Sequence, residues 1–167
     1  HGIKADVIIG ARDKSLIILE EEMKAVAENV YIANENGSYG FAGRATDLLQ
    51  KLVKEDGKVY NKAVIIGPMI MMKFTTMTTK ELGIPTIVSL NPIMVDGTGM
   101  CGACRVTVGD EVKFACVDGP EFDGFKVNFD EAMRRQTIYK TAEGKAKLEF
   151  EEGATHKNGG CGCGGDK

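Results

Sequence analysis

The sequence predicts an α/β protein in which a Rossmann-like parallel sheet is followed by a small loop-and-hairpin module. Three observations support this fold class. Short apolar runs alternate with longer amphipathic stretches up to residue 90, a segment rich in Gly and Cys follows the last run, and a hairpin pattern follows that segment. The chain has 167 residues, which suits about one domain with a hydrophobic core of its own.

The apolar runs have the length of strands that are buried on both faces. They are Ala5 to Ile9, Asn29 to Ala33, Ala63 to Ile66 and Pro85 to Leu90. The stretches between them have helical periods, carried by Leu16, Leu19, Met23 and Val26, then by Ala45, Leu48, Leu49, Leu52 and Val53, and less regularly by Met69, Met72, Thr76, Met77 and Lys80. This alternation predicts a parallel sheet with right-handed crossovers.

The pattern changes after Leu90. Residues 96–104 are too rich in Gly to lie inside a helix or strand, and residues 105–108 and 112–115 predict a hairpin around residues 109–111. Asn128 is placed to cap a short helix that runs to about Gln136, with Glu131 at the capping-box position. From residue 141 the chain is polar, so we expect residues 141–167 to form a mobile tail.

Composition excludes several classes of partner. Lys and Arg number 21 against 24 Asp and Glu, and the net charge of −3 provides no basic surface for nucleic acid or anionic membranes. No apolar run approaches the roughly 20 residues of a membrane span. Of the five Cys, three lie close together in the sequence and two lie near its end. This arrangement suits metal ligation in a reducing cytoplasm better than a disulfide framework. We therefore expect a cytoplasmic protein.

Four residues have the spacing of an iron–sulfur ligand set. Four residues separate Asp96 from Cys101, two separate Cys101 from Cys104, and eleven separate Cys104 from Cys116. This is the plant-type two-iron ferredoxin pattern with Asp in place of the first Cys. The intervening glycines would let the loop curl closely enough for backbone N–H groups to reach cluster sulfides. The sequence therefore favours a [2Fe-2S] cluster.

Other interpretations of these residues remain open. The Cys101–Cys104 pair also fits a thiol redox pair or half of a zinc site, and Asp96 also fits a surface turn. The run Gly97-x-Gly99-x-x-Gly102 matches a dinucleotide fingerprint, but that fingerprint must open a helix, whereas a hairpin follows here. Cys161 and Cys163, with His156 nearby, could bind a metal. Three scattered donors are few, so a Gly-rich tail without a metal is the favoured interpretation of this segment.

Several segments together resemble a known family. They are Gly10-Ala11-Arg12, Asn36 to Gly40, Gly43 to Asp47, Ile66 to Met72 and Asn91 to Cys104. Over residues 5 to about 137 the chain resembles the small subunit of NADH-dependent reduced ferredoxin:NADP⁺ oxidoreductase, in the ferredoxin-NADP⁺ reductase superfamily. Its relatives are the electron-transfer subunit of dihydroorotate dehydrogenase and sulfide dehydrogenase-type flavoproteins. The set of one Asp and three Cys is specific to the ferredoxin:NADP⁺ branch, since the dihydroorotate branch uses four Cys.

The resemblance implies an electron-transfer oxidoreductase subunit. In the family, a β-barrel holds FAD, a Rossmann-like domain docks NADP(H) or NAD(H), and a [2Fe-2S] cluster relays electrons to a larger iron–sulfur flavoprotein subunit and indirectly to ferredoxin. Electron bifurcation occurs in some members. This chain has no flavin barrel and lacks the first βα unit of the nucleotide domain, so we expect His1 to mark a cut inside a longer subunit. The fragment alone should be inactive and should not bind FAD.

The resemblance also assigns residues. It places Gly10, Arg12 and Lys14 near the adenosine phosphate, Gly67, Pro68 and Met69 near the nicotinamide, and Asp96, Cys101, Cys104 and Cys116 at the cluster. Arg12 also fits a solvated cation at a helix start. No side chain is expected to act as a general acid or base, because cofactors carry this chemistry.

We expect three parts in the chain. Residues 1–93 would form part of an NAD(P)-binding domain, residues 94–140 the cluster module with its short helix, and residues 141–167 the tail. The alternative functions are an electron-transfer subunit of a dihydroorotate or sulfide dehydrogenase, and a non-catalytic, zinc-stabilised interaction module.

Overall fold

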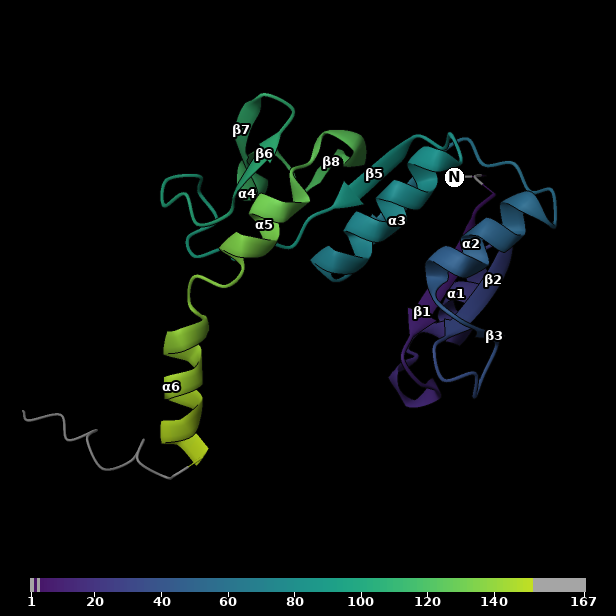
Figure 1. The fold of residues 1–167 in the computed structure, drawn as a ribbon, viewed down its shortest axis with the longest axis horizontal. Coiled ribbons are helices and arrows are strands. Elements are labelled where there is room, and N and C mark those ends of the chain that lie inside the picture. The colour runs from purple at the N-terminus through teal and green to yellow at the C-terminus, as the bar shows by residue number, and fades with distance from the viewer. Residues whose placement is uncertain (1, 3, 152–167) are drawn as a thin grey trace, which may run out of the picture.

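The computed structural model describes residue 2 and residues 4–151, which form an elongated α/β molecule (Figure 1). Its strands are β1 (Asp6–Ala11), β2 (Asn29–Asn34), β3 (Phe41–Ala42), β4 (Ala63–Ile66), β5 (Thr86–Ser89), β6 (Arg105–Val108), β7 (Glu111–Phe114) and β8 (Glu121–Asp123). Its helices are α1 (Glu20–Val26), α2 (Ala45–Lys54), α3 (Met69–Glu81), α4 (Ala115–Asp118), α5 (Phe129–Arg135) and α6 (Lys140–Glu151), with 3-10 turns η1 (Lys14–Leu16) and η2 (Gly124–Lys126).

The predicted α/β fold class with parallel strands is confirmed, but the strands form separate sheets. β1, β2 and β3 pair in parallel in one sheet. In a second sheet β4 pairs in parallel with β5, and β8 adds to β5 in the antiparallel sense. The described strands β1 and β4 therefore do not pair with each other, although the alternating pattern indicated one sheet. Sequence order predicts crossovers, whereas pairing between strands depends on packing across the molecule.

The first sheet is covered by α2. Its apolar stripe places Leu48 and Leu52 against Ala33 of β2, and all three side chains are buried. Asp47 closes the start of the helix, because its Oδ2 accepts a hydrogen bond from the Arg44 backbone N–H at 3.0 Å. This small core is separate from the larger one in the rest of the molecule.

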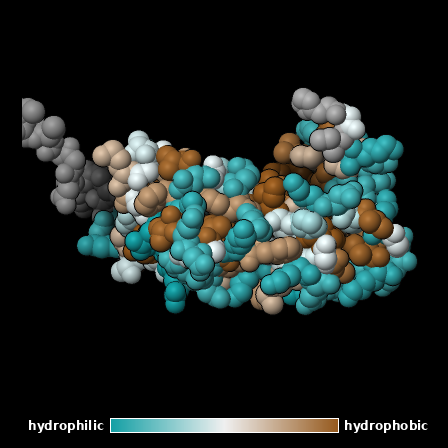
Figure 2. Space-filling model, turned by 90° about the horizontal axis from the view of Figure 1, so that it is seen from above, coloured by the Kyte–Doolittle hydropathy of each residue, from teal (hydrophilic) through white to brown (hydrophobic). Residues whose placement is uncertain are grey.

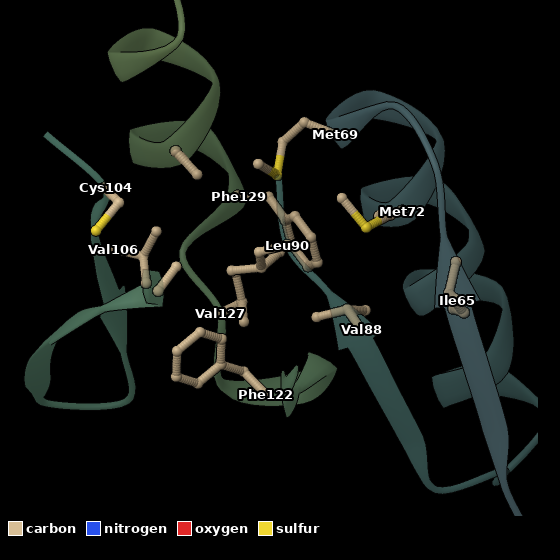
Figure 3. Packing of buried hydrophobic residues seen from close by; sticks show 12 residues of the cluster. Ile65, Met69, Met72, Val88, Leu90, Cys104, Val106, Phe122, Val127 and Phe129 are labelled. Atoms are coloured by element: carbon tan, nitrogen blue, oxygen red, sulfur yellow. The ribbon is translucent and has the colours of Figure 1, made fainter. Parts of the chain in front are cut away.

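The larger core joins the second sheet to the module that follows it (Figure 3). Met69 and Met72 of α3 and Val88 of β5 contribute from one side. The module contributes Cys104, Val106, Ala115, Phe122, Val127, Phe129 and Ala132. The boundary expected between residues 93 and 94 thus lies within a single packed unit, and the Cys104 side chain belongs to its core.

The helix predicted from Asn128 is present as α5. The Asn128 Oδ1 accepts a hydrogen bond from the Glu131 N–H at 3.0 Å, which confirms the N-cap. The Glu131 carboxylate accepts a hydrogen bond from the Thr107 hydroxyl of β6. The carboxylate therefore ties α5 to the hairpin. The Asn128 N–H donates to the Thr107 carbonyl at 2.9 Å, so it does not complete the predicted capping box with Glu131.

Residues 140–151 form α6, which the sequence analysis did not predict. None of its side chains is buried, and Figure 1 shows it projecting away from the other elements. Ion pairs one turn apart join Lys145 to Glu149 and Lys147 to Glu151, which supports a helix without an apolar face. His156, Cys161 and Cys163 lie outside the described residues.

Exposed apolar side chains occur at several places on the described surface. Figure 2 shows hydrophobic areas interspersed with hydrophilic ones on one face of the molecule. The exposed set includes Val64 and Ile66 of β4, and Met94, Val95 and Met100 in the segment between β5 and β6. Among the described helices, none combines the length and the apolar character that crossing a membrane requires.

Candidate metal centre

The β6–β7 hairpin brings Cys104 and Cys116 together. The strands pair from Arg105 opposite Phe114 to Val108 opposite Glu111, and the Ala115 N–H donates to the Cys104 carbonyl at 3.2 Å. The two cysteines flank this paired end, and their Sγ atoms lie 3.3 Å apart. That separation exceeds the length of about 2.05 Å of a disulfide bond. The hairpin thus returns Cys116 to the loop, and its thiol is free.

Asp96 and Cys101 form a second pair at the start of the loop. The Asp96 Oδ1 accepts a hydrogen bond from the Thr98 N–H at 2.9 Å, and Oδ2 accepts one from the Cys101 N–H at 3.0 Å. The Thr98 N–H holds the pKa of the Asp96 carboxyl below its ordinary value. The carboxylate is therefore charged at neutral pH and lies against the backbone of Cys101. The hydrogen bond from Thr98 is the geometry expected of a surface turn residue. The contact with Cys101 also places the Asp96 carboxylate where a first cluster ligand would lie.

The loop backbone depends on glycine. Gly97, Gly99 and Gly102 have φ angles of +74°, +83° and +66°, in the left-handed region that other residues rarely adopt. A Cβ on Gly99 would lie 3.1 Å from Cγ2 of Val117, the residue after Cys116. A Cβ on Gly97 would meet nothing within 4 Å. The loop thus approaches the α4 segment most closely at Gly99.

Replacing Gly99 with alanine should weaken the loop more than replacing Gly97. Both alanines carry the cost of the left-handed backbone, about 1–2 kcal/mol. Only Gly99→Ala also displaces Val117 beside Cys116. We expect Gly99→Ala to lower both the unfolding temperature and the iron retained after gel filtration below the values for Gly97→Ala. Equal values for the two variants would contradict the close approach.

The four predicted ligands form two pairs. In the part of the chain that the structure describes, no three His, Cys, Asp or Glu side chains converge on a site for a single metal ion. A structural zinc ion needs four convergent ligands, whereas the ligands of a two-iron cluster are divided between its two irons. Cys104 and Cys116 present their sulfur atoms to each other, whereas Asp96 contacts Cys101 through the Cys101 backbone N–H.

The cysteines of the two pairs differ in exposure. Cys101 is exposed, and its Sγ accepts a hydrogen bond from the Ala103 N–H at 3.5 Å, whereas Cys104 is 2% exposed. The hydrogen bond with the Cys104 thiol raises the pKa of Cys116, because it stabilises the protonated form of the Cys116 thiol. The site therefore has one side in the core and one side at the surface.

The residues expected near an adenosine phosphate lie at the end of β1. Gly10 lies in the strand, where a Cβ would approach the Ala45 Cβ of α2 to 3.3 Å, so its visible role is helix packing. Arg12 and Lys14 follow β1 and are exposed, and the Lys14 Nζ lies 4.6 Å from the centre of the Tyr39 ring. Ligands of parallel α/β sheets bind beyond the carboxyl ends of the strands, where these cations lie.

The residues expected near a nicotinamide lie between β4 and α3. A Cβ on Gly67 would clash with the Met71 Cε, and Pro68 is the exposed N-cap of α3. Met69 is 3% exposed and packs in the large core, so its side chain is not accessible to a ligand. These residues come after β4 of the second sheet, whereas Arg12 and Lys14 come after β1 of the first sheet.

The sequence analysis missed two side chains that hold the backbone of the metal site. The Asp118 Oδ2 accepts a hydrogen bond from the Phe114 N–H at 2.7 Å. The Arg135 Nη2 donates to the Gly102 carbonyl at 3.0 Å and to the Ala103 carbonyl at 3.3 Å. The Arg135 contacts join residues more than 30 positions apart, so no local pattern marks them.

Comparison with known proteins supports this assignment of the loop and hairpin. Residues 91–128 match the family described as the iron–sulfur cluster binding domain of dihydroorotate dehydrogenase B. This match covers Asp96 and the three described cysteines. Residues 91–128 are therefore similar to an iron–sulfur binding domain, and they follow a unit with parallel strands.

Longer matches cover most of the chain. It is 46% identical over 150 residues to a Thermotoga maritima homologue of the electron-transfer subunit of dihydroorotate dehydrogenase B (NAD⁺), covering 90% of this chain and 51% of that protein. It is 69% identical over 167 residues to a Clostridium beijerinckii protein described as an uncharacterized protein in the adh 3′ region, covering 100% of this chain and 56% of that protein.

A solved structure matches in both sequence and fold. A chain in the structure of NADH-dependent reduced ferredoxin-NADP oxidoreductase, reported for its insights into flavin-based electron bifurcation, aligns with a TM-score of 0.79 and 44% identity. The alignment covers 92% of this chain and 53% of that chain. The chain is thus similar to part of an electron-transfer subunit homologue of dihydroorotate dehydrogenase B and to part of a chain in this oxidoreductase structure, as its motifs indicated. It spans about half the length of the relatives it matches.

Proposed function

We propose that this chain is the cluster-bearing part of an electron-transfer subunit, in which Asp96, Cys101, Cys104 and Cys116 hold a [2Fe-2S] cluster. The observation that supports this most is the 3.3 Å approach of the Cys104 and Cys116 thiols at the end of the hairpin, within the segment that matches the iron–sulfur family. When bound, the cluster accepts and passes on single electrons.

The chain's own residues control access to this site. Cys104 is buried in the large core, which excludes water from one side. Cys101 lies at the surface, which leaves the other side open to a redox partner. Thiols must lose their protons to bind a metal, so loading should release protons from Cys101, Cys104 and Cys116. Asp96 is already ionised and contributes its charge without such a release.

The wider function that we propose is electron transfer between NADP(H) or NAD(H), FAD and the cluster, toward a larger iron–sulfur flavoprotein subunit and indirectly toward ferredoxin. FAD would be bound by a part of the subunit outside residues 1–167. The exposed cations Arg12 and Lys14 suit a nucleotide phosphate. The cysteine usage favours a cytoplasmic location. A dihydroorotate dehydrogenase electron-transfer subunit is a second candidate, favoured by the match of residues 91–128.

Metal analysis of the chain distinguishes the cluster from the zinc alternative. The protein, purified and reconstituted without oxygen, should contain about two iron and two sulfide per chain, as the formula of a [2Fe-2S] centre requires. It should be brown, with a visible absorption that dithionite bleaches. A colourless protein with one zinc per chain would instead support a zinc-stabilised interaction module.

Substitutions of Asp96 test its place as the first ligand. Asp96→Cys should keep the cluster, because the loop already has the four-residue spacing of an all-Cys site. It should also shift the visible spectrum and the reduction potential, since thiolate is the softer and more strongly donating ligand. Asp96→Ala should leave one iron open to water and make the cluster labile. The measurements are iron content, spectrum and potential.

Asp110→Ala is the matched control, because Asp110 is an exposed carboxylate in the hairpin turn of the same module. It should leave all three measurements unchanged. Normal iron content, spectrum and potential in Asp96→Ala would show that Asp96 is only a turn residue.

A further inference from the structure

The end of α5 holds the loop that carries the cluster ligands. Arg135, the last residue of the helix, donates through Nη2 to the carbonyls of Gly102 and Ala103 at 3.0 and 3.3 Å. These are the two residues between Cys101 and Cys104. The next side chain, Gln136, donates through Nε2 to the Asn91 carbonyl at 3.1 Å. Two neighbouring side chains thus hold both ends of the segment from residue 91 to residue 103.

The helix that presents Arg135 is itself firmly held. Phe129 and Ala132 of α5 are buried in the large core. On the exposed side, the Lys73 Nζ of α3 lies 2.6 Å from the Asp130 Oδ1. Arg135 is therefore fixed to a rigid element and can orient a loop that has few regular hydrogen bonds of its own.

The hydrogen bonds of one peptide unit connect Arg135 to a ligand sulfur. The Gly102 carbonyl accepts from Arg135, and the N–H of the same peptide, on Ala103, donates to the Cys101 Sγ at 3.5 Å. The C=O and N–H of a trans peptide point in opposite directions. By holding the carbonyl on one side, Arg135 directs the N–H toward the sulfur on the other.

The guanidinium also brings a permanent charge to this place. Arg135 is half-buried, and its Nε is buried with no hydrogen-bond partner among the described residues. An arginine stays protonated under all ordinary conditions. Partial removal from water reduces the screening of this charge. Reduction of a cluster adds negative charge, which a nearby cation and an N–H aimed at sulfur both stabilise.

We propose that Arg135 is a positioning residue of the cluster site, which orients the Cys101–Cys104 loop and raises the reduction potential of the cluster. This inference rests on the proposed function of Asp96 and the three cysteines as ligands. It assigns two separable effects to one side chain. The positive charge acts on the potential, and the planar guanidinium, called the fork below, holds two carbonyls at once.

Three variants of the 167-residue chain separate these effects. Arg135→Gln removes the charge and the fork, and Arg135→Lys keeps the charge but not the fork. Arg134→Gln is the matched control, because Arg134 is the exposed neighbour on the same helix and has the same charge. Each is reconstituted with iron and sulfide, and its reduction potential and rate of iron loss to a chelator are measured. Amide hydrogen exchange of residues 101–104 is measured on the metal-free chain.

We expect Arg135→Gln to lower the potential, to lose iron faster and to exchange the loop amides faster than wild type. Arg135→Lys should restore most of the potential while the loop amides stay fast. Arg134→Gln should match wild type in all three. A wild-type potential and exchange rate in Arg135→Gln, or equal changes in Arg134→Gln, would overturn the proposal.

The exchange measurement keeps this inference distinct from the proposed function. If wild-type protein takes up no iron, the cluster assignment fails, and the proposed effect on the potential fails with it. The loop-holding role is still decided by the metal-free exchange rates. If Arg135→Gln does not fold, the comparison of Arg135→Lys with Arg134→Gln decides both roles. Wild-type amide exchange in Arg135→Lys would show that the two guanidinium hydrogen bonds do not hold the loop. A lowered reduction potential in Arg135→Lys would show that the positive charge is not what raises the potential.

Discussion

Cys104→Ala should abolish iron binding while leaving a folded chain. Cys104 is 2% exposed and its Sγ lies 3.3 Å from that of Cys116, so its loss removes one ligand and separates the other from its pair. A [2Fe-2S] centre needs four protein ligands, and alanine offers no donor. We expect almost no iron and no visible absorption after reconstitution, with the far-ultraviolet circular dichroism of wild type.

Val117→Ala is the control for Cys104→Ala. Val117 is an exposed residue next to Cys116 in α4, and its truncation removes apolar atoms from the same region without removing a donor. It should retain full iron content. If Cys104→Ala retained a full complement of iron and sulfide, Cys104 would be only a buried core residue, and the ligand set would have to be sought elsewhere.

Met72→Ala is the substitution expected to destabilise the described fold most. The Met72 side chain is 0% exposed, in the core that joins the second sheet to the cluster module. Truncation of a buried Met to Ala costs about 2–5 kcal/mol of unfolding free energy, since apolar contacts are lost and a cavity remains. Urea unfolding followed by circular dichroism measures this cost.

Met77→Ala provides the comparison on the same helix. Met77 is 51% exposed, so its truncation should change the unfolding free energy by less than about 0.5 kcal/mol. Because Leu90 and Phe129 share the core with Met72, the reconstituted Met72→Ala protein should also lose its iron at a lower urea concentration than wild type. Loss of iron at the wild-type urea concentration, with unfolding shifted lower, would show that the module and the second sheet are independent units.

Local patterns accounted for most of the secondary structure. β1, β2, β4 and β5 lie where the apolar runs predicted them, because a short apolar run is a local pattern in the sequence. The expectation that these strands are buried on both faces is wrong for β4, in which Val64 and Ile66 are exposed. The helix α6 was missed for a related reason. It has no apolar stripe, which is the pattern that predicts an amphipathic helix, and it is supported by Lys–Glu pairs one turn apart.

In the candidate site, too, local features could be predicted from the sequence and contacts between distant residues could not. The spacing of Asp96, Cys101, Cys104 and Cys116 is visible in the sequence because a short loop must wrap around its ligand. The division into two pairs is not visible there. It depends on the hairpin, which closes Cys104 on Cys116, and on the Asp96 carboxylate, which accepts from the Cys101 N–H.

The sequence by itself thus determined the α/β class, the order of the elements and the candidate ligands, all of which follow from patterns within a few turns or one loop. Only the tertiary structure decided that the sheet is divided between β1 and β4, that β8 joins β5, that the core extends across residue 93 and that Arg135 holds the ligand loop. These features join residues distant along the chain. They depend on which faces pack together, and packing is a property of the folded molecule as a whole.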